Sequence, residues 1–399
     1  MELRKMDNQA KITMISDENY SYYKRSQIIQ LISKSCTEEE LFLEGSNFYE
    51  EIGADFLYNR VKEVLPEKNQ VLLKDSSTLK YDSLLIASGG EPVVIPWKNV
   101  NLEGISTLYT LNDAKKVANL ACDAKNAVII GGGSIAMKVV KNLLKIGLNV
   151  SIVEKSTHLW PIGFDRKVAR IIEHKLEENK VKLYLNEEVV GFNGENGKVS
   201  SITLQNLQEI PCDLVIITIG MKPNVDFIKN SGIVLDKGVI VDKFLRTNIS
   251  NIYAAGDVAQ TEDPLFDSPI LHPTWGNAKK QGKIAAKNMS GIITEYKGTI
   301  LIQTIKIFGF RAISAGITHS KKNLDEISWI SFQNGFIRKF VINNNRLVGI
   351  LLLGKDLDKK KLKPLIKKAV FNMVDVSRYK TKLLDEDFDF NVIITNKKS

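Results

Sequence analysis

The sequence predicts an α/β protein with a doubly wound nucleotide-binding domain at its centre and a separate α+β domain at its carboxyl-terminal end. Three observations support this prediction. A strand–helix–strand pattern with glycines at its first turn spans residues 126–154. Other apolar runs of strand length also end in glycine turns, at Gly89, Gly220 and Gly256. From about residue 297 the sequence changes to short runs of alternating polar and apolar residues, which are typical of strands.

The first elements of the chain are short. Residues 1–6 have the pattern of a helix end, and residues 12–15 form an apolar strand. A tyrosine-rich loop follows and contains Arg25. Taken alone, this loop is equally consistent with an anchored surface segment and with the rim of a binding site for a planar ligand, in which Arg25 binds a phosphate group. Residues 39–51 are expected to be helical, and strands are expected at residues 54–58, 61–65 and 71–73.

The next strand, residues 84–87, runs into Ser88 and Gly89. Glycine at the carboxyl end of such a strand provides flexible backbone where ligands bind in open α/β sheets. Proline and glycine at positions 96 and 104 mark a crossover into the central nucleotide-binding unit.

That unit gives the strongest signal in the chain. Residues 127–130 have the length and the β-branched content of a buried parallel strand, and three glycines follow at once. Apolar residues at helical spacing then run over residues 135–146, where Gly147 ends the helix. A second strand is expected over residues 150–153, with Glu154 at its end. The pattern is G-x-G-x-x-A with an acidic residue a little over twenty positions beyond the first glycine.

Each residue of this pattern has a physical purpose. Gly131 permits the tight turn, Gly133 lets the backbone approach a pyrophosphate, and Ala136 keeps the helix close to the strand. The helix amino terminus offers free N–H groups and a partial positive charge to the phosphates. Glu154 is placed to bind the ribose hydroxyls, which favours NADH over NADPH, although the neighbouring Lys155 weakens this preference.

Further strands lead to two more glycine turns. A helix is expected at residues 165–179, and a strand at 213–218 ends at Gly220. A strand at 251–254 ends at Gly256 and Asp257, where we expect a helix to begin. Asp257 is therefore either a helix cap or a ligand contact. In the carboxyl-terminal domain, the remaining elements are expected as follows: strands at 304–308, 329–332, 340–342 and 347–353, and a helix at 363–373.

Composition excludes several classes of protein. The 399 residues are 44% apolar, enough for two or three domains, and no apolar run is long enough to suggest a membrane span. The first residues are charged, unlike a signal peptide. Three scattered cysteines form neither a metal site nor a disulfide framework, which is typical of a cytoplasmic protein. The net charge of +9 is dispersed without interleaved aromatic residues, so we expect no nucleic-acid partner, although the basic surface is compatible with an acidic protein partner.

Taken together, the motifs resemble the flavoprotein family of pyridine-nucleotide-dependent oxidoreductases. The resemblance is to the branch of the NADH:rubredoxin reductases, the dioxygenase ferredoxin reductases and the flavin part of the NADH-nitrite reductases. It covers essentially the whole chain, and its motifs occur in the family's order: YDSLLIASGGEP (81–92), GGGSIA (131–136), CDLVIITIGMKPN (212–224), NIYAAGDVA (251–259) and LHPTWGNAKKQGKIAAKNM (271–289).

The resemblance implies two doubly wound, Rossmann-like domains and a carboxyl-terminal α+β domain. The FAD-binding domain would be discontinuous (1–104 and 238–297), the NAD(P)H-binding domain would span 105–237, and the last domain 298–399. The family's pattern places Asp257 on the flavin ribityl chain, Arg25 near the FAD phosphates and the segment Trp275–Gln281 beside the isoalloxazine. The implied cofactor contacts also include Ser88, Gly89, Gly220 and Gly256.

Three departures from the family pattern matter. First, the family begins with a strand, a glycine loop and a helix that bind the FAD pyrophosphate, and residues 1–6 match only the tail of that helix. We expect a mis-assigned start or a fragmentary gene, because the strand at residues 12–15 would otherwise lack its inner neighbour. Second, no cysteine follows the tyrosine-rich loop, so a flavin would pass electrons directly to an acceptor. Third, a glutamate and a lysine of the family near the nicotinamide are here Lys138 and Gln30.

These patterns predict a flavoprotein oxidoreductase that passes hydride from NADH to FAD and electrons to a small carrier such as rubredoxin or ferredoxin. The alternative is a degenerate or truncated protein that binds the nicotinamide nucleotide but cannot hold FAD. No metal site and no acid–base pair are expected, and His272 is the one histidine within a cofactor-side motif. A homodimer formed through the carboxyl-terminal domain is possible on this reading.

Overall fold

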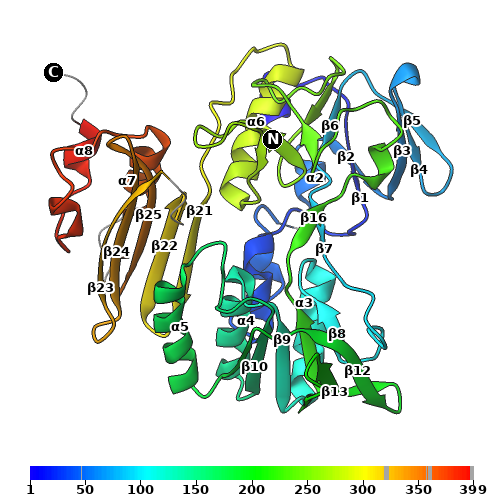
Figure 1. Cartoon of the computed structure of the whole chain (residues 1–399). Helices are drawn as coiled ribbons and strands as arrows, with labels where there is room; N and C mark the ends of the chain where they lie inside the picture. Colours follow the sequence, from blue (N-terminus) through cyan, green and yellow to red (C-terminus); the bar gives the residue numbers. More distant parts are fainter. Residues whose placement is uncertain (46, 319–322, 356, 358–361, 396–399) are drawn as a thin grey trace. The chain divides into compact units, whose positions relative to one another are not determined.

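The protein is described by a computed structural model that covers residues 1–45, 47–318, 323–355, 357 and 362–395 (Figure 1). The chain forms two compact units. The first consists of Met1–Ile28, Cys36–Glu91 and Met221–Thr299, and the second of Ile29–Ser35, Pro92–Gly220 and Ile300–Ser399. Both contain parallel strands with helices, and the second also contains a β-rich carboxyl-terminal part, so the predicted α/β class is confirmed.

The second unit is built around a five-stranded parallel sheet in the order β11-β10-β9-β15-β8. Its strands are Lys182–Leu185, Asn149–Glu154, Asn126–Ile130, Leu214–Ile217 and Ile105–Thr107, and its helices are α3 (Leu111–Asp123), α4 (Ser134–Lys145) and α5 (Arg166–Glu178). The central strands are buried on both faces, as their continuous apolar sequence predicts. The strand, helix and strand expected within residues 127–153 are all present.

Helix α4 ends where the sequence predicts. Gly147 has a φ of +86°, in the left-handed region that glycine adopts without strain. Its N–H donates to the carbonyl of Leu144 (3.0 Å), and the N–H of Leu148 donates to that of Leu143 (3.2 Å). These two bonds satisfy carbonyl groups that the last helical turn leaves free.

Two antiparallel sheets complete the second unit. One is a small sheet of β12 (Val189–Glu195), β13 (Lys198–Leu204) and β14 (Glu209–Pro211), in which β12 and β13 form a hairpin. The other has the order β21-β22-β25-β24-β23. Its strands are Ile302–Ile307, Phe310–Gly316, Arg346–Gly354, Phe336–Asn343 and Asp325–Ser331, and they are followed by α7 (Leu362–Phe371), η5 (Lys382–Leu384) and α8 (Asn391–Thr395).

A buried lysine joins this last sheet to α5. Lys339 on β24 is 2% exposed, and its ammonium lies 2.6 Å from a carboxylate oxygen of Asp165 and 2.8 Å from one of Glu326. Asp165 is also the N-cap of α5, because its other carboxylate oxygen accepts from the Val168 N–H (3.0 Å). A buried ammonium needs such partners, and here two carboxylates provide them.

The first unit contains two separate pairs of parallel strands. Strand β1 (Ile12–Ser16) pairs with β2 (Ala54–Tyr58), and β6 (Leu84–Ile86) pairs with β18 (Ile252–Ala254). In the described part of the chain neither β1 nor β6 has a second strand partner. Apolar side chains on β1 are accordingly only partly covered, and Met14 is 44% exposed.

The remaining elements of the first unit surround these strands. They are the helices α1 (Glu2–Met6), α2 (Phe48–Glu51) and α6 (Trp275–Met289), the 3-10 turns η2 (Glu39–Leu41), η3 (Pro66–Lys68) and η4 (Asp226–Ile228), the meander of β3 (Val61–Leu65), β4 (Gln70–Leu73) and β5 (Thr78–Lys80), and the sheet of β17 (Val239–Ile240), β19 (Ala259–Thr261) and β20 (Ile270–Leu271). Three elements lie at the limits of the units: η1 (Arg25–Leu31), β7 (Gly90–Pro92) and β16 (Met221–Pro223).

Arg4 holds α1 in place. Its guanidinium donates to the carbonyl groups of Ile52 (2.9 Å) and Gly53 (2.7 Å), and also to those of Asn8 (2.9 Å) and Ala10 (2.8 Å). One side chain therefore satisfies backbone carbonyls on both sides of β1 along the chain. The short helix, which α6 also contacts, depends on this residue for its position.

Two sequence predictions in the first unit are wrong. Residues 39–51 do not form one helix but the two short elements η2 and α2, because Gly45 between them has a φ of +83°. No helix begins at Asp257 either. Gly256, with a φ of +86°, opens a turn that leads into β19, and the next α-helix is α6. Among the described residues, no helix has the length and hydrophobicity needed to cross a membrane.

Candidate functional site: two glycine turns for nucleotides

The first glycine turn lies between β9 and α4 in the second unit. Gly131 has a φ of +95°, and a Cβ atom there would lie 2.8 Å from the carbonyl oxygen of Thr218 on the neighbouring segment. The Thr218 hydroxyl itself donates to the Gly131 carbonyl (2.9 Å). The backbone is thus folded tightly against the strand beside it, and only glycine fits.

Gly133 and Ala136 occupy the next positions of the pattern. A Cβ atom at Gly133 would meet nothing within 4 Å, so the backbone is open on that side to a ligand. Gly133 is also the N-cap of α4, and no side chain caps the helix. The first N–H groups of α4 are therefore available for an anion. Ala136 is fully buried, so a larger residue would push α4 away from the sheet.

The middle glycine, Gly132, is also required at its position, and the sequence pattern does not predict this requirement. A Cβ atom there would lie 2.4 Å from a methyl group of Leu159 and 3.1 Å from a carboxylate oxygen of Glu154. Only the contact across the turn shows this requirement, because Leu159 follows the second strand and is distant in sequence. No spacing rule for the glycine pattern includes it.

Glu154 lies at the end of β10 and faces this turn. One of its carboxylate oxygens accepts from the Gly132 N–H (2.6 Å), and the other accepts from the Ser156 N–H (2.8 Å). Each oxygen keeps a second lone pair, which a ribose hydroxyl could use. Lys155 does not compete for this position, because its ammonium lies 2.9 Å from Glu188.

Lys138 lies one turn into α4 and is half-buried. Burial lowers the pKa of its ammonium, and the nearby positive charge of Lys363 on α7 lowers it further. It lies on α4, the helix that follows the glycine turn.

The second group of predicted residues lies in the first unit. Gly256 and Asp257 follow β18, and the Gly256 N–H donates to the side-chain carbonyl of Gln281 (2.7 Å) on α6. Gln281 is fully buried. Gln281 is the last residue of the segment Trp275–Gln281 that the resemblance expects beside the isoalloxazine, and its hydrogen bond fixes the turn that presents Asp257.

Asp257 is a half-buried carboxylate without a hydrogen bond or ion pair to any described residue. Burial raises the pKa of its carboxyl group, and the positive charge of Arg25 partly opposes this rise. Such a group is an available acceptor for hydroxyl donors, which suits a polyhydroxyl chain.

Arg25 lies at the start of η1 and is partly exposed. Its guanidinium forms an ion pair with Glu18 and lies over the ring of Tyr23, 5.0 Å from the centroid. The Tyr23 hydroxyl donates to the other oxygen of the same carboxylate (2.6 Å). Glu18 thus holds Arg25 in place near Asp257 in the first unit.

Ser88 and Gly89 form hydrogen bonds with the Lys-Pro-Asn segment that ends at Asn224. The Ser88 hydroxyl donates to the carbonyl of Asn224 (2.7 Å), and the Asn224 N–H donates to the carbonyl of Gly89 (3.0 Å). The glycine turn at 88–89 and the K-P-N segment are therefore bound to each other. Gly220, with a φ of +120°, ends the strand segment before that motif.

Trp275 and His272 lie at the start of α6. Trp275 is the first residue of the helix, is 44% exposed, and has the Lys279 ammonium 5.1 Å from its ring centroid. His272 is fully buried, with Nε2 3.1 Å from an oxygen of the equally buried Asp263. No group of three metal-ligating side chains occurs among the described residues, and the three cysteines there are unpaired.

Comparison with known proteins identifies the class. Residues 1–297 match the family model described as pyridine nucleotide-disulphide oxidoreductase, and residues 302–370 match the rubredoxin NAD+ reductase C-terminal domain. The chain therefore belongs to the pyridine nucleotide-disulphide oxidoreductase family, and the second match places it with the branch that includes the rubredoxin and ferredoxin reductases.

Individual relatives agree with this class. The chain is 26% identical to the nitrite reductase [NAD(P)H] of Bacillus subtilis over 363 residues, which are 90% of the chain and 44% of that protein. It is 27% identical to the epsilon subunit of the NADH-dependent phenylglyoxylate dehydrogenase of Aromatoleum evansii, covering 79% of the chain and 75% of that subunit. The chain thus spans less than half the length of the nitrite reductase and of the assimilatory nitrate reductase electron transfer subunit of Bacillus subtilis.

Solved structures show the same fold. The ferredoxin reductase of the CYP199A2 system from Rhodopseudomonas palustris superimposes with a TM-score of 0.87 at 21% identity, over 98% of this chain and 95% of that one. The NAD-dependent persulfide reductase of A. fulgidus superimposes with a TM-score of 0.88 at 24% identity, over 99% of this chain and 79% of that one.

The family's cofactors are FAD and NAD(P)H, and the residues present are chemically suited to both. The open backbone at Gly133 and the uncapped amino terminus of α4 suit a dinucleotide pyrophosphate. In the first unit, the carboxylate of Asp257, which has no hydrogen-bond partner in the described part of the chain, suits a polyhydroxyl chain, and the cation of Arg25 suits a phosphate.

Proposed function

We propose that this chain is an NAD(P)H-dependent FAD oxidoreductase that takes hydride from NADH and delivers electrons to a small redox protein such as rubredoxin or ferredoxin. The observation that carries the proposal is the presence of two glycine turns of different character in one chain. Gly131–Gly133 opens onto an uncapped helix, and Gly256 presents the unpartnered carboxylate of Asp257.

The residues of the first turn would bind NADH. Gly133 leaves room for the pyrophosphate, the first N–H groups of α4 donate to it, and Glu154 accepts from the ribose hydroxyls. A 2′-phosphate would meet the negative charge of Glu154 at this point, so NADH is preferred over NADPH.

The residues of the second turn would hold FAD. Asp257 would accept from the ribityl hydroxyls, and Arg25, held by Glu18, would lie on a phosphate. Ser88 and Gly89 support this region through their bonds to Asn224. When bound, FAD supplies the chemistry, since a flavin accepts a hydride and releases electrons singly.

The cysteines support direct transfer of electrons from the flavin to the acceptor. The sequence at residues 26–30 contains no thiol. Burial raises the pKa of Cys36, with a further rise from Glu40, and burial raises the pKa of Cys212 to about 12. Neither thiol is poised as the thiolate that redox relay requires.

The three-domain division remains part of the proposal. The five-stranded parallel sheet lies within residues 105–237, which supports a NAD(P)H-binding domain over that range. The antiparallel sheet and α7 lie within 298–399, and the strands β1, β2, β6 and β18 lie within the two segments 1–104 and 238–297. We further propose a cytoplasmic location, on the unpaired cysteines, and a homodimer.

The test is electron transfer by the purified chain supplied with FAD. Anaerobic NADH should reduce added rubredoxin or ferredoxin, followed by the loss of the carrier's visible absorbance, and NADPH should do so more slowly. Rubredoxin and ferredoxin names among the relatives motivate these two acceptors. A chain that binds FAD but reduces neither carrier would contradict the proposed acceptor class, while a chain that binds NADH but never FAD would favour the non-catalytic alternative.

A further inference from the structure

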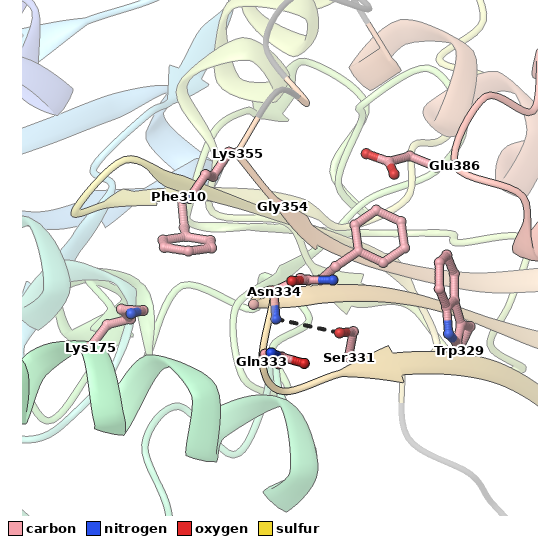
Figure 2. Close-up of a pocket in the computed structure, with 11 residues that line it drawn as sticks. Lys175, Phe310, Trp329, Ser331, Gln333, Asn334, Gly354, Lys355 and Glu386 are labelled. Atoms are coloured by element: carbon pink, nitrogen blue, oxygen red, sulfur yellow. Dashed lines mark hydrogen bonds between the residues drawn. The ribbon is translucent and has the colours of Figure 1, made fainter.

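A cavity of about 430 Å³ lies in the second unit, far along the chain from both glycine turns (Figure 2). It is lined by the last turn of α5, the β23–β24 hairpin, the start of β22, the end of β25 and the segment after η5. Its volume suits a small molecule rather than a protein segment. Two ends of different chemistry can be distinguished.

One end is cationic. The ammonium groups of Lys175 and Lys355 each lie 5.6 Å from the centroid of the Phe310 ring. Lys175 is paired with Glu178 (2.6 Å), whereas Lys355 has no ion-pair or hydrogen-bond partner among the described residues. Figure 2 shows both lysines on the same side of the cavity as Phe310. This end attracts an anion, and Lys355 is its available charge.

The other end is aromatic and carries an acceptor. Trp329 is 46% exposed, and its ring packs against Phe336 in a T-shaped geometry with centroids 4.9 Å apart. The indole is therefore fixed and still presents surface. Glu386 lies on this side of the cavity, away from the two lysines (Figure 2). Its carboxylate disfavours a second anion here and accepts from an N–H donor.

The floor between the two ends is polar and preformed. Gln333 and Asn334 line it with side-chain amides, and the Asn334 N–H donates to the Ser331 hydroxyl (3.4 Å). Gly335 has a φ of +61°, and a Cβ atom there would lie 2.4 Å from the Phe310 ring. Glycine thus allows the hairpin turn to lie against Phe310, which sets the width of the cavity.

This cavity is distinct from the dinucleotide turn. Asp165 lies at the amino end of α5, which faces the carboxyl ends of the sheet strands. Lys175 lies ten residues further along the same helix. At 1.5 Å per residue the two ends are about 15 Å apart. No residue of Gly131–Ala136 and no part of Glu154 lines the cavity.

We propose that this cavity binds a nucleoside phosphate, as a nucleotide site additional to those proposed for NADH and FAD. The phosphate would lie at Lys355 and Lys175, the base would stack on Trp329, and Glu386 would accept from an exocyclic amino group of the base. Such a molecule has a planar neutral ring with an amino donor at one end, which matches Trp329 and Glu386. It has an anionic group at the other end, which matches the two lysines. An acidic peptide would place charge beside Glu386, and inorganic phosphate would leave the aromatic end uncovered.

The experiment is calorimetric titration of the full chain with AMP, UMP, adenosine and inorganic phosphate, with binding stoichiometry as the readout. In the Lys175→Gln/Lys355→Gln double variant, the affinity of the cavity for AMP should fall by on the order of a hundredfold. The titration of wild type should therefore show one AMP site more than that of the double variant. UMP, which has no amino group, and inorganic phosphate should each bind this site at least about tenfold more weakly than AMP.

Two further variants guard against a folding artefact. Trp329→Ala should weaken AMP binding at the cavity about tenfold, while Trp329→Phe should retain most of it, because the ring is what stacks. The matched control is Lys368→Gln, an exposed lysine of α7 outside the cavity, which should bind AMP as wild type does. All variants should keep the wild-type melting temperature and NADH affinity.

Three results would overturn the proposal. The double variant could bind AMP with the same stoichiometry and affinity as Lys368→Gln. Inorganic phosphate could compete at the cavity as well as AMP does, which would make the cavity an anion site only. UMP could bind as tightly as AMP, which would remove the recognition assigned to Glu386. Because none of these readouts requires flavin, failure of the proposed oxidoreductase activity would leave this test unaffected.

Discussion

At Gly131 the backbone leaves β9 with a φ of +95° and passes so close to Thr218 that no side chain could be accommodated. Two residues later, at Gly133, φ is −78° and the space beside the Cα atom is open. The two glycines therefore serve different purposes. Gly131 is required by the backbone packing of the turn, whereas we propose that glycine at position 133 leaves room for the pyrophosphate of a ligand.

Paired alanine substitutions separate these two roles. Gly131→Ala should lower the free energy of unfolding by about 1–3 kcal/mol, because it combines a left-handed φ with a clash against a carbonyl. Gly133→Ala should leave the unfolding free energy within about 0.5 kcal/mol of wild type and weaken NADH binding at least about tenfold, through the added methyl group. Urea denaturation and NADH titration measure both. Wild-type NADH affinity in Gly133→Ala would show that no phosphate lies there.

We propose that Glu154 determines the choice of nicotinamide nucleotide. Glu154→Arg should weaken NADH binding and improve NADPH binding, because a cation replaces the carboxylate at the ribose position. The matched control is Lys155→Gln, which should not alter the preference, since the Lys155 ammonium is paired with Glu188. Dissociation constants for both nucleotides provide the measurement. An unchanged NADH/NADPH ratio in Glu154→Arg would remove Glu154 from this role.

At the scale of elements, α5 is fixed at its amino end by one carboxylate with two partners. Asp165 caps the helix through Val168 and pairs with the buried Lys339. Burial alone would raise the pKa of Asp165, but the hydrogen bonds from Lys339 and from the Val168 N–H outweigh it, and the pKa is lowered below 3.8. The ionised form is thus the one that the fold stabilises.

This lowered pKa sets a direction for the pH dependence of stability. The contribution of Asp165 is fully present above the ordinary pKa of 3.8 and is lost as the pH falls through the lower value in the folded chain. Asp165→Asn retains a cap acceptor but removes the charge, and should lower the free energy of unfolding by about 1–3 kcal/mol at neutral pH. The difference in the free energy of unfolding between this variant and wild type should become smaller at acidic pH. A difference that stays constant from neutral to strongly acidic pH would contradict this assignment.

The element α1 depends on one arginine in the same way. Arg4→Ala should destabilise the first unit by about 1–3 kcal/mol, because four carbonyl groups lose a charged donor and must accept hydrogen bonds from water instead. Arg4→Lys is the matched variant, and it should recover little, since an ammonium cannot span the same carbonyls. Hydrogen exchange at residues 8–10 and 52–53 would report the loss. Unchanged protection in Arg4→Ala would show that other contacts hold α1.

The helices and strands differ in how far the sequence could predict them. The β9–α4–β10 unit is predictable because its periodicity, its glycines and its final Gly147 all act within a few residues. Strand β22 was not predicted, because Phe310–Gly316 is buried over most of its length and shows no alternation of polar and apolar residues. The helix expected at Asp257 is absent because the turn at Gly256 is fixed by Gln281, twenty-five residues away.

The candidate site divides in the same way. Gly131, Gly133, Ala136 and Glu154 follow from a local pattern, and the structure brings them to one turn. The need for glycine at position 132 arises from Leu159, and the position of Arg25 arises from Glu18. The contact between position 132 and Leu159 is a packing contact across the turn, and the ion pair between Arg25 and Glu18 depends on a particular loop conformation. Neither has a spacing rule that a single sequence reveals.

At the scale of the whole molecule, the chain belongs to the pyridine nucleotide-disulphide oxidoreductase family and carries residues suited to two nucleotide cofactors. One of its departures from the expected family pattern concerns charge. Lys138, whose pKa is lowered by burial and by Lys363, stands where the family pattern has a carboxylate. The central claim is therefore that hydride passes between the two cofactors despite this change of sign.

One measurement tests that claim most directly. The purified chain, loaded with FAD and freed of excess cofactor, is titrated anaerobically with NADH while the visible flavin absorbance is followed. The account predicts that the absorbance is bleached by about one equivalent of NADH per flavin, that Gly133→Ala requires far more NADH, and that admission of air restores the colour. A chain that retains FAD and binds NADH, but whose flavin absorbance stays unchanged, would contradict the account.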